Sequence, residues 1–227
     1  MAFNKKKKLK IALLSTKKNP LLKRNIREIL KKNTIEFIAY DKKQDPKAKM
    51  LWKQRTKNRV SEIKLKKKIK SYFFSNHNNS KLVNLVKKKK IDLLISCSSP
   101  RIIKQQLLNA PKIGILNCHP GLLPFYRGCN CVEWALYNKD KVGNTCHLMT
   151  KRIDQGPIIC SRRINIQKSK DYYDVRIAVY LDSVKLISKA IEIIKKDNYN
   201  KKIIVGGKYW KVMDKFKLEK IINIMKK

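Results

Sequence analysis

The residues with the clearest capacity for chemistry lie in the middle of the chain. Asn117 and His119 stand two residues apart after an apolar run, and Asp154 follows later on a glycine-containing loop. Residues two apart on a strand project to the same side. An amide and an imidazole placed this way can stabilise the oxyanion of an attacked carbonyl and move a proton, and a carboxylate can orient the imidazole. The sequence therefore predicts a catalytic group, although a lone histidine at a strand end is more often structural.

The residues around this group resemble the folate-dependent formyltransferase family. The chain reads N-C-H-P-G-L-L-P-F-Y-R-G from residue 117 to 128 and D-Q-G from 154 to 156. The family signature N-x-H-P-S-L-L-P-x-x-x-G, followed by D-x-G, is matched in order and spacing apart from one glycine. Clear resemblance covers residues 91–166, and the order of elements matches more loosely elsewhere. The resemblance implies transfer of a formyl group from 10-formyltetrahydrofolate, the expected co-substrate, to a primary amine.

The resemblance also implies a role for each residue. Asn117 would donate a hydrogen bond to the formyl oxygen, and His119 would stabilise its charge or shuttle the proton lost by the amine. Asp154 would orient His119 directly or through water. The residues implied to line the folate pocket are Arg101, Ile102 and Ile103, with backbone groups facing the pterin edge, together with Leu122, Leu123, Pro124 and Gly156. For Arg101, a surface residue that opens a helix is an equal alternative.

Departures from the family pattern bear on the amine acceptor. Gly121 replaces the usual serine, which is expected to loosen the loop without removing a catalytic group. The stretch Ser15–Pro20 replaces the Gly-Ser-Asn phosphate loop of the glycinamide ribonucleotide enzymes. The chain also ends before the additional C-terminal domain of the methionyl-tRNA enzymes. We therefore expect a small-molecule acceptor, foremost a nucleotide-linked amino sugar. Glycinamide ribonucleotide, methionyl-tRNA and a chain that only binds folate remain alternatives.

The elements that must position these residues follow from the apolar pattern. The predicted strands are 9–15, 34–40, 91–97, 113–118, 144–150 and 157–166, and the predicted helices are 20–32, 80–90, 100–109, 129–138 and 171–196. Strands that alternate with helices predict an α/β, Rossmann-like fold with a mostly parallel twisted sheet and helices on both faces. This arrangement places Asn117 and His119 at the carboxyl end of a parallel strand, where open sheets of this class bind ligands.

Two segments give weaker signals. Residues 41–70 are Lys-rich and predict one or two exposed helices with a mobile connection. The expected domains are a formyltransferase catalytic domain over residues 1–200 and a C-terminal tail or small subdomain over 201–227. The tail turns at Gly206 and Gly207 and then carries the aromatic pair Tyr209 and Trp210. Docking on the sheet edge is the favoured interpretation, and a lid over the acceptor site is the alternative.

The charge of the chain is its most conspicuous compositional feature. With 56 Lys and Arg against 16 Asp and Glu, the formal net charge is +40. This favours nonspecific binding of polyanions. Dedicated nucleic-acid binding on the same fold is the alternative of another functional class, but the chain has no zinc-finger spacing, aromatic RNP-like strand or Arg cluster. Lysines occur in almost every predicted helix but are absent from Ile113–Asn138, which indicates burial or a shaped site there.

The cysteines and the hydropathy exclude other classes of site. All six cysteines lie between residues 97 and 160 without a C-x-x-C pair, so we expect no metal site and thiols that pack as small apolar side chains. His77 is expected in an exposed loop, and His147 as a structural strand residue. No apolar run approaches eighteen residues, and the run 11–14 is too short for a signal peptide. A cytoplasmic protein with no membrane span is expected; the oligomeric state stays open.

Overall fold

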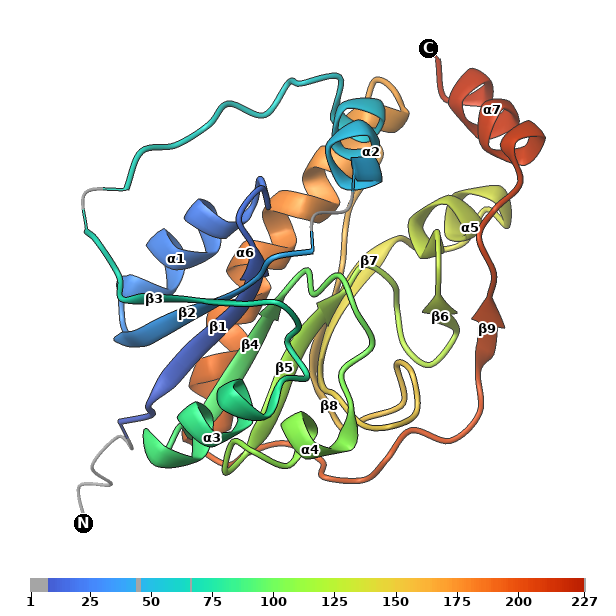
Figure 1. The fold of residues 1–227 in the computed structure, drawn as a ribbon. Coiled ribbons are helices and arrows are strands. Elements are labelled where there is room, and N and C mark those ends of the chain that lie inside the picture. The colour runs from blue at the N-terminus through green and yellow to red at the C-terminus, as the bar shows by residue number, and fades with distance from the viewer. Residues whose placement is uncertain (1–7, 44–45, 66, 227) are drawn as a thin grey trace, which may run out of the picture.

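The computed structural model describes residues 8–43, 46–65 and 67–226, and a seven-stranded sheet lies at its centre. The order of strands is β3-β2-β1-β4-β5-β7-β8 (Figure 1). Their bounds are β1 (Ile11–Thr16), β2 (Ile35–Asp41), β3 (Ser71–Phe74), β4 (Leu93–Cys97), β5 (Gly114–His119), β7 (Gly143–Leu148) and β8 (Ile158–Arg163). The pairs from β3 to β5 are parallel, whereas β5–β7 and β7–β8 are antiparallel. The prediction of a mostly parallel α/β sheet is confirmed.

Helices cover both faces of this sheet (Figure 1). Helices α1 (Leu22–Leu30) and α6 (Tyr172–Lys195) cover one face, and α3 (Ser80–Lys88) and α4 (Gln105–Leu108) cover the other. Side chains of β1 alternate between these layers, since Ile11 and Leu13 pack in the first core and Ala12 and Leu14 in the second. The two cores hold β5 rigidly between its neighbours.

The helix predicted from residue 100 begins only at Gln105. Asn78 holds the preceding segment in an extended form, because its Oδ1 accepts from Lys104 N at 2.7 Å and its Nδ2 donates to Ile102 O at 2.9 Å. The prediction was wrong for these residues because Asn78 comes from a segment far away in the sequence. The helix predicted from residue 20 begins at Leu22, since the Asn19 side chain holds a turn there.

The C-terminal tail docks on the signature loop and not on the edge of the main sheet. Strand β9 (Lys208–Trp210) pairs in parallel with β6 (Tyr126–Gly128) in a separate two-stranded sheet. The Trp210 ring stacks on Tyr126 with centroids 5.5 Å apart, and its Nε1 donates to Phe125 O at 3.0 Å. The expectation of docking at the sheet edge was wrong, because these strands of three residues carry no periodic signal of their own.

The Lys-rich segment after β2 contains the helix α2 (Pro46–Thr56), and the tail contains α7 (Lys215–Ile224) beside α5 (Cys131–Tyr137). Helix α2 packs against α6, where the Trp52 and Tyr180 rings lie 4.9 Å apart. The expected mobile connection falls partly on residues 44–45 and 66, which lie outside the described residues. Within the described part of the chain, no helix combines the length and apolar character needed to cross a bilayer.

Candidate active site

Strand β5 brings the first two predicted residues to the carboxyl end of the parallel part of the sheet. Asn117 pairs in register with His147 of β7, and His119 pairs with Thr145. Because side chains alternate along a strand and paired residues share a face, all four side chains project to the same face of the sheet. The sequence-based expectation that Asn117 and His119 point to one side agrees with this register.

Asp154 joins the two imidazoles. Its Oδ2 lies 3.5 Å from His119 Nδ1, and its Oδ1 lies 3.6 Å from His147 Nε2. Oδ2 also accepts from Gly128 N at 2.8 Å, which fixes the carboxylate against the signature loop. Asp154 has φ of 54°, a left-handed conformation that aspartate tolerates better than most residues. The structure therefore brings Asn117, His119 and Asp154 into one cluster.

The His119 ring is buried and held at both nitrogens. Nε2 lies 2.7 Å from Tyr126 O, and a carbonyl oxygen only accepts, so Nε2 carries a proton. Nδ1 faces Asp154 Oδ2. Gly121 packs on this ring, because a Cβ there would lie 2.7 Å from Nε2 and 2.6 Å from Tyr126 O. The expectation that Gly121 loosens the loop is corrected: it lets the loop close tightly over His119.

His147 orients the Asn117 amide, a role that the sequence analysis did not assign. Its Nδ1 lies 3.1 Å from Leu148 O and donates to that carbonyl, which leaves Nε2 to accept from Asn117 Nδ2 at 3.2 Å. Burial lowers the pKa of His147 to about 4, against the opposing effect of Asp154. Near neutral pH the ring is therefore the neutral acceptor that this contact needs. The alternation of Thr145 and His147 on one strand was the available signal.

Thr145 anchors the signature loop to β7. Its Oγ1 donates to Gly121 O at 2.8 Å and accepts from Leu123 N at 3.1 Å, and Ser161 Oγ lies 3.2 Å away. Gly156 serves the opposite loop, because a Cβ there would lie 1.6 Å from Leu148 O. These contacts fix the signature loop that follows His119 and the loop that carries Asp154.

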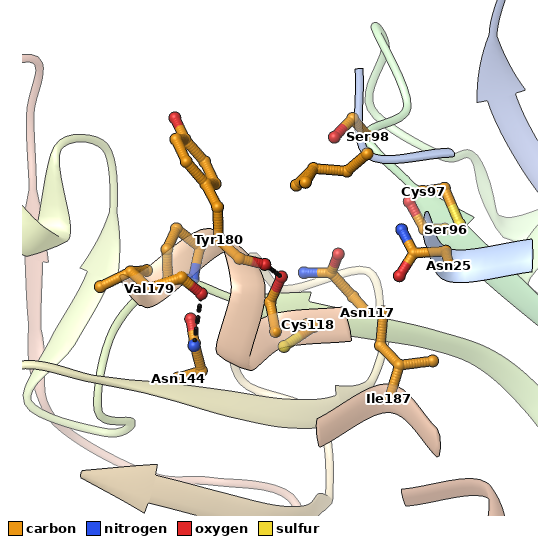
Figure 2. A pocket seen from close by; sticks show the side chains of 13 residues that line it. Asn25, Ser96, Cys97, Ser98, Asn117, Cys118, Asn144, Val179, Tyr180 and Ile187 are labelled. Atoms are coloured by element: carbon orange, nitrogen blue, oxygen red, sulfur yellow. Dashed lines mark hydrogen bonds between the residues drawn. The ribbon is translucent and has the colours of Figure 1, made fainter. Parts of the chain in front are cut away.

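A cavity of about 220 Å³ opens beside Asn117, between the sheet, α1 and α6 (Figure 2). Its lining includes Ser96 from β4, Pro120 from the signature loop, and Tyr180 and Ser183 from α6. His119 is not among its described lining residues. Asn117 is thus the member of the cluster that meets the cavity directly.

Tyr180 is fixed at this cavity by a buried charged network. Its hydroxyl accepts from Arg176 Nη2 at 2.5 Å and lies 3.5 Å from Arg55 Nη1. Burial alone would raise the pKa of Tyr180, but the two guanidinium groups outweigh it and hold the pKa below its usual value. The fully buried Glu133 lies 3.7 Å from Arg176 Nε and 3.6 Å from Arg55 Nε, and accepts from Tyr172 Oη at 2.6 Å. The network ties α2, α5 and α6 together.

A second hollow of about 460 Å³ adjoins the signature loop. Leu122, Leu123, Phe125, Lys141 and Arg163 are among its lining residues. Pro124, the third residue expected here, follows a cis peptide bond and its carbonyl lies against Gly207. Arg101–Ile103 do not line this hollow. The grouping of both segments with Gly156 into one folate pocket stays a prediction.

The Arg101 segment is built around the buried carboxylate of Asp41. Arg101 Nε and Nη2 donate to it at 2.8 and 3.2 Å, and Nη2 also donates to Ser75 O. Burial would raise the pKa of Asp41, but these bonds and the backbone N–H of His77 lower it. Ile102 is exposed and Ile103 is buried in the core. Arg101 does not open a helix, contrary to one expectation.

His77 corrects another expectation, since it is fully buried and not exposed in a loop. Its ring nitrogens lie 3.1 Å from Ser99 Oγ and 3.2 Å from Ala39 O, which lets a polar ring enter the protein interior. The cysteines are free thiols, and burial raises the pKa of Cys97 to about 12. Among the described residues no group of three metal-ligating side chains gathers.

The chain resembles known proteins over most of its length. The family model described as formyl transferase matches residues 9–191. The bifunctional polymyxin resistance protein ArnA of Wigglesworthia glossinidia brevipalpis is 34% identical over 142 residues, which are 62% of this chain and 22% of that protein. Methionyl-tRNA formyltransferases of several bacteria match at 31–43% identity. The chain spans only 22–39% of the length of these curated relatives.

Solved structures share the fold. Glycinamide ribonucleotide transformylase 1 from Symbiobacterium toebii has a TM-score of 0.65 at 16% identity, covering 87% of this chain and 94% of that one. A sugar N-formyltransferase from Shewanella sp. has a TM-score of 0.64 at 21% identity, covering 90% and 77%. Because the family model spans most of the residues and includes the whole Asn117–Asp154 cluster, the chain belongs to the formyl transferase family.

Proposed function

We propose that this chain transfers a formyl group from 10-formyltetrahydrofolate to a primary amine. The observation that carries this proposal is the cluster of Asn117, His119 and Asp154 beside a cavity at the carboxyl end of β5. An amide donor, an imidazole and a carboxylate that orients it are the groups that attack on an acyl carbon requires. Membership of the formyl transferase family supports the same chemistry.

In the proposed reaction, 10-formyltetrahydrofolate supplies an activated formyl group when it is bound. Asn117 Nδ2 donates one hydrogen to His147 and can turn its second hydrogen to the formyl oxygen, where negative charge develops. His119 is held between Tyr126 O and Asp154 on the same face of the sheet as Asn117, where its ring would help to stabilise that charge. As the amine nitrogen bonds to the formyl carbon, the bond from that carbon to the folate nitrogen would break. The proton lost by the amine is expected to pass to Nδ1 of His119 or to Asp154, directly or through water, and from there to the folate nitrogen that leaves.

The segment after β4 has a position and an exposed apolar side chain that suit a bound folate. A flat, polar ring needs backbone hydrogen-bonding groups at its edge and an apolar wall. The Ser98–Ile103 segment follows β4 at the same end of the sheet as Asn117, and Ile102 is 73% exposed. These features support Arg101–Ile103 as part of the folate site, with Ile102 as an apolar wall; backbone contacts would use groups other than the carbonyls of Arg101 and Ile102, which accept from Ser99 and Asn78.

The acceptor we favour is a nucleotide-linked amino sugar. The lining of the cavity beside Asn117 includes residues with hydroxyl and amide side chains, which suit a polar and uncharged amine-bearing fragment. Residues 15–20 differ from the phosphate loop of the glycinamide ribonucleotide enzymes. Asn19 Nδ2 donates to Ser15 Oγ and Cys97 O, so this amide is not free to bind a phosphate, which makes glycinamide ribonucleotide a less favoured acceptor.

The experiment that tests the proposal is a screen of amine acceptors with 10-formyltetrahydrofolate as the donor. Nucleotide-linked amino sugars, glycinamide ribonucleotide and charged initiator tRNA are compared at moderate salt, because the net charge of +40 promotes nonspecific tRNA binding at low salt. We expect formylation of an amino-sugar nucleotide. Turnover of tRNA alone would reassign the acceptor, and no turnover of any amine would refute formyl transfer itself.

A further inference from the structure

The cavity beside Asn117 carries two buried hydrogen-bond acceptors that no group in the described structure satisfies. Asn144 is fully buried, and Asn25 is 4% exposed. The Oδ1 atoms of both have no hydrogen-bond partner, and both residues line the cavity. Buried amide oxygens are normally paired, because an unpaired one retains its full desolvation cost. Two such atoms at one cavity point to a ligand that donates hydrogen bonds.

The orientation of the Asn144 amide is fixed by its neighbours. Nδ2 donates to Val179 O at 2.9 Å and to Asp182 Oδ2 at 3.0 Å. Both of these oxygens only accept, so rotating the amide would bring its own oxygen against them. Asp182 is in turn held by Arg162 Nη1 at 2.7 Å. Oδ1 is therefore the atom of Asn144 that is left for a ligand.

The lining of the cavity carries no charge. None of its described lining residues is Lys, Arg, Asp or Glu, in a chain with 56 basic residues. A phosphate or carboxylate would lose its hydration there and find no cation among the described lining residues, since Arg55 and Arg176 are engaged with the Tyr180 hydroxyl and with Glu133. The volume of about 220 Å³ also lies below the roughly 300–1,000 Å³ of pockets that take a whole drug-sized ligand. The cavity therefore suits one uncharged fragment, with any phosphate outside it.

We infer that Asn25 and Asn144 recognise hydroxyl groups beside the amine of the acceptor, so that the cavity selects an amine carried on an uncharged, hydroxyl-bearing ring. This rests on the proposed function. Figure 2 shows the two side chains on either side of Asn117, and both line the same cavity. An apolar amine such as a methionyl group would leave both oxygens unpaired. Sites built to bind a hydroxyl discriminate strongly against analogues that lack it.

The test is equilibrium binding of unreacted acceptors, measured by calorimetry without the formyl donor. The probes are a nucleotide-linked amino sugar and its analogue in which the hydroxyl next to the amine is replaced by hydrogen. We expect the wild type to bind the hydroxylated sugar at least about tenfold more tightly. Asn25→Leu should abolish most of this preference and remain folded, because it replaces an unsatisfied buried polar group by an apolar one of similar size.

The matched control is Asn84→Leu, the same replacement at an exposed position of α3, which should keep the full preference. Asn144→Leu is a secondary variant only, because it also removes two hydrogen bonds that hold α6. Equal binding of the two sugars, no binding of either, or an unchanged preference in folded Asn25→Leu would overturn the inference. Because no formyl donor is present, these outcomes are independent of whether formyl transfer occurs.

Discussion

Two hollows flank the signature loop, and they differ in charge. The cavity beside Asn117 has an uncharged lining of serine, asparagine and apolar residues. The hollow beyond Leu123 is larger and includes Lys141, Arg163 and Asp140. Asp140 accepts from the Tyr126 hydroxyl at 2.6 Å, and burial together with this carboxylate raises the pKa of Tyr126 to about 12. Basic side chains, which are abundant in the chain, therefore line one of the described hollows and not the other.

The difference shows where desolvation limits the use of lysine in this chain. Lysine is tolerated wherever its ammonium group can reach water, as at the rim of the larger hollow. Inside a small cavity between a sheet and two helices, an unpaired ammonium would have to lose its hydration. The comparison predicts that changes at the Asn117 side affect the acceptor and the reaction most.

The largest effect is expected from removal of the candidate catalytic groups. Asn117→Ala, His119→Ala and Asp154→Ala should each lower kcat by about 10²–10³-fold, because each removes a donor, a charge or the group that positions it. Formyl transfer rates together with thermal unfolding curves check this prediction. A folded His119→Ala protein with a nearly unchanged rate would contradict the assigned chemistry.

A charge placed in the uncharged cavity should have the next largest effect. Ser183 of α6 lines this cavity, and Ser183→Lys should raise the KM for the acceptor by about 100-fold, because the new side chain occupies space and brings an unpaired ammonium. The KM for the folate donor should change much less. Steady-state kinetics with each substrate varied in turn distinguish the two.

The control for this change is Ser188→Lys, further along the same helix on a different side and outside the described lining of the cavity. It introduces the same side chain into α6 and should leave the acceptor KM within about twofold. An equal rise in acceptor KM in both variants would show that the charge of α6, and not the cavity, determines binding.

The sequence was sufficient for the features that depend on local pattern. The apolar runs and their alternation with helices predicted the sheet and both covering layers, and the signature motif located Asn117, His119 and Asp154. What it could not provide depends on residues far apart in the chain. The burial of His77 requires the backbone of β2, and the docking of Trp210 requires the loop at Tyr126. The pairing of His147 with Asn117 depends on an antiparallel register that no single segment encodes.

A smaller effect is expected from His147, which touches Asn117 but is not proposed to touch the substrate. His147→Gln should lower kcat by about 10- to 100-fold, because a displaced amide weakens contact with the formyl oxygen. The KM for the acceptor should change little. A parallel loss in kcat and in acceptor binding would indicate a general collapse of the cavity.

His147 also predicts how stability depends on pH. Its pKa in the folded protein is about 4, below the value near 6.5 of an unfolded chain. Between these values the unfolded state binds a proton that the folded state does not, so the free energy of unfolding should fall as pH decreases from 6.5 toward 4. Burial lowers the pKa of His77 as well, which adds to the same slope. Unfolding curves of wild type and His147→Gln should therefore diverge less at low pH than at neutral pH.

The smallest effect on the reaction is expected from the tail. Trp210 stacks on Tyr126 and lies 4.7 Å from the Trp134 ring, and its strand pairs with β6. Strand β6 contacts the catalytic cluster at two points, because Tyr126 O lies against His119 Nε2 and Gly128 N donates to Asp154. Loss of Trp210 would affect the cluster only through these two contacts.

Trp210→Ala should lower the free energy of unfolding by about 2 kcal/mol and should lower kcat less than His147→Gln does. Trp210→Phe keeps an aromatic ring but loses the bond to Phe125 O, and should cost about 1 kcal/mol. Rates measured well below each unfolding midpoint separate the two effects. A loss of kcat in Trp210→Ala as large as in His119→Ala would mean that the tail takes part in catalysis and does not only support β6.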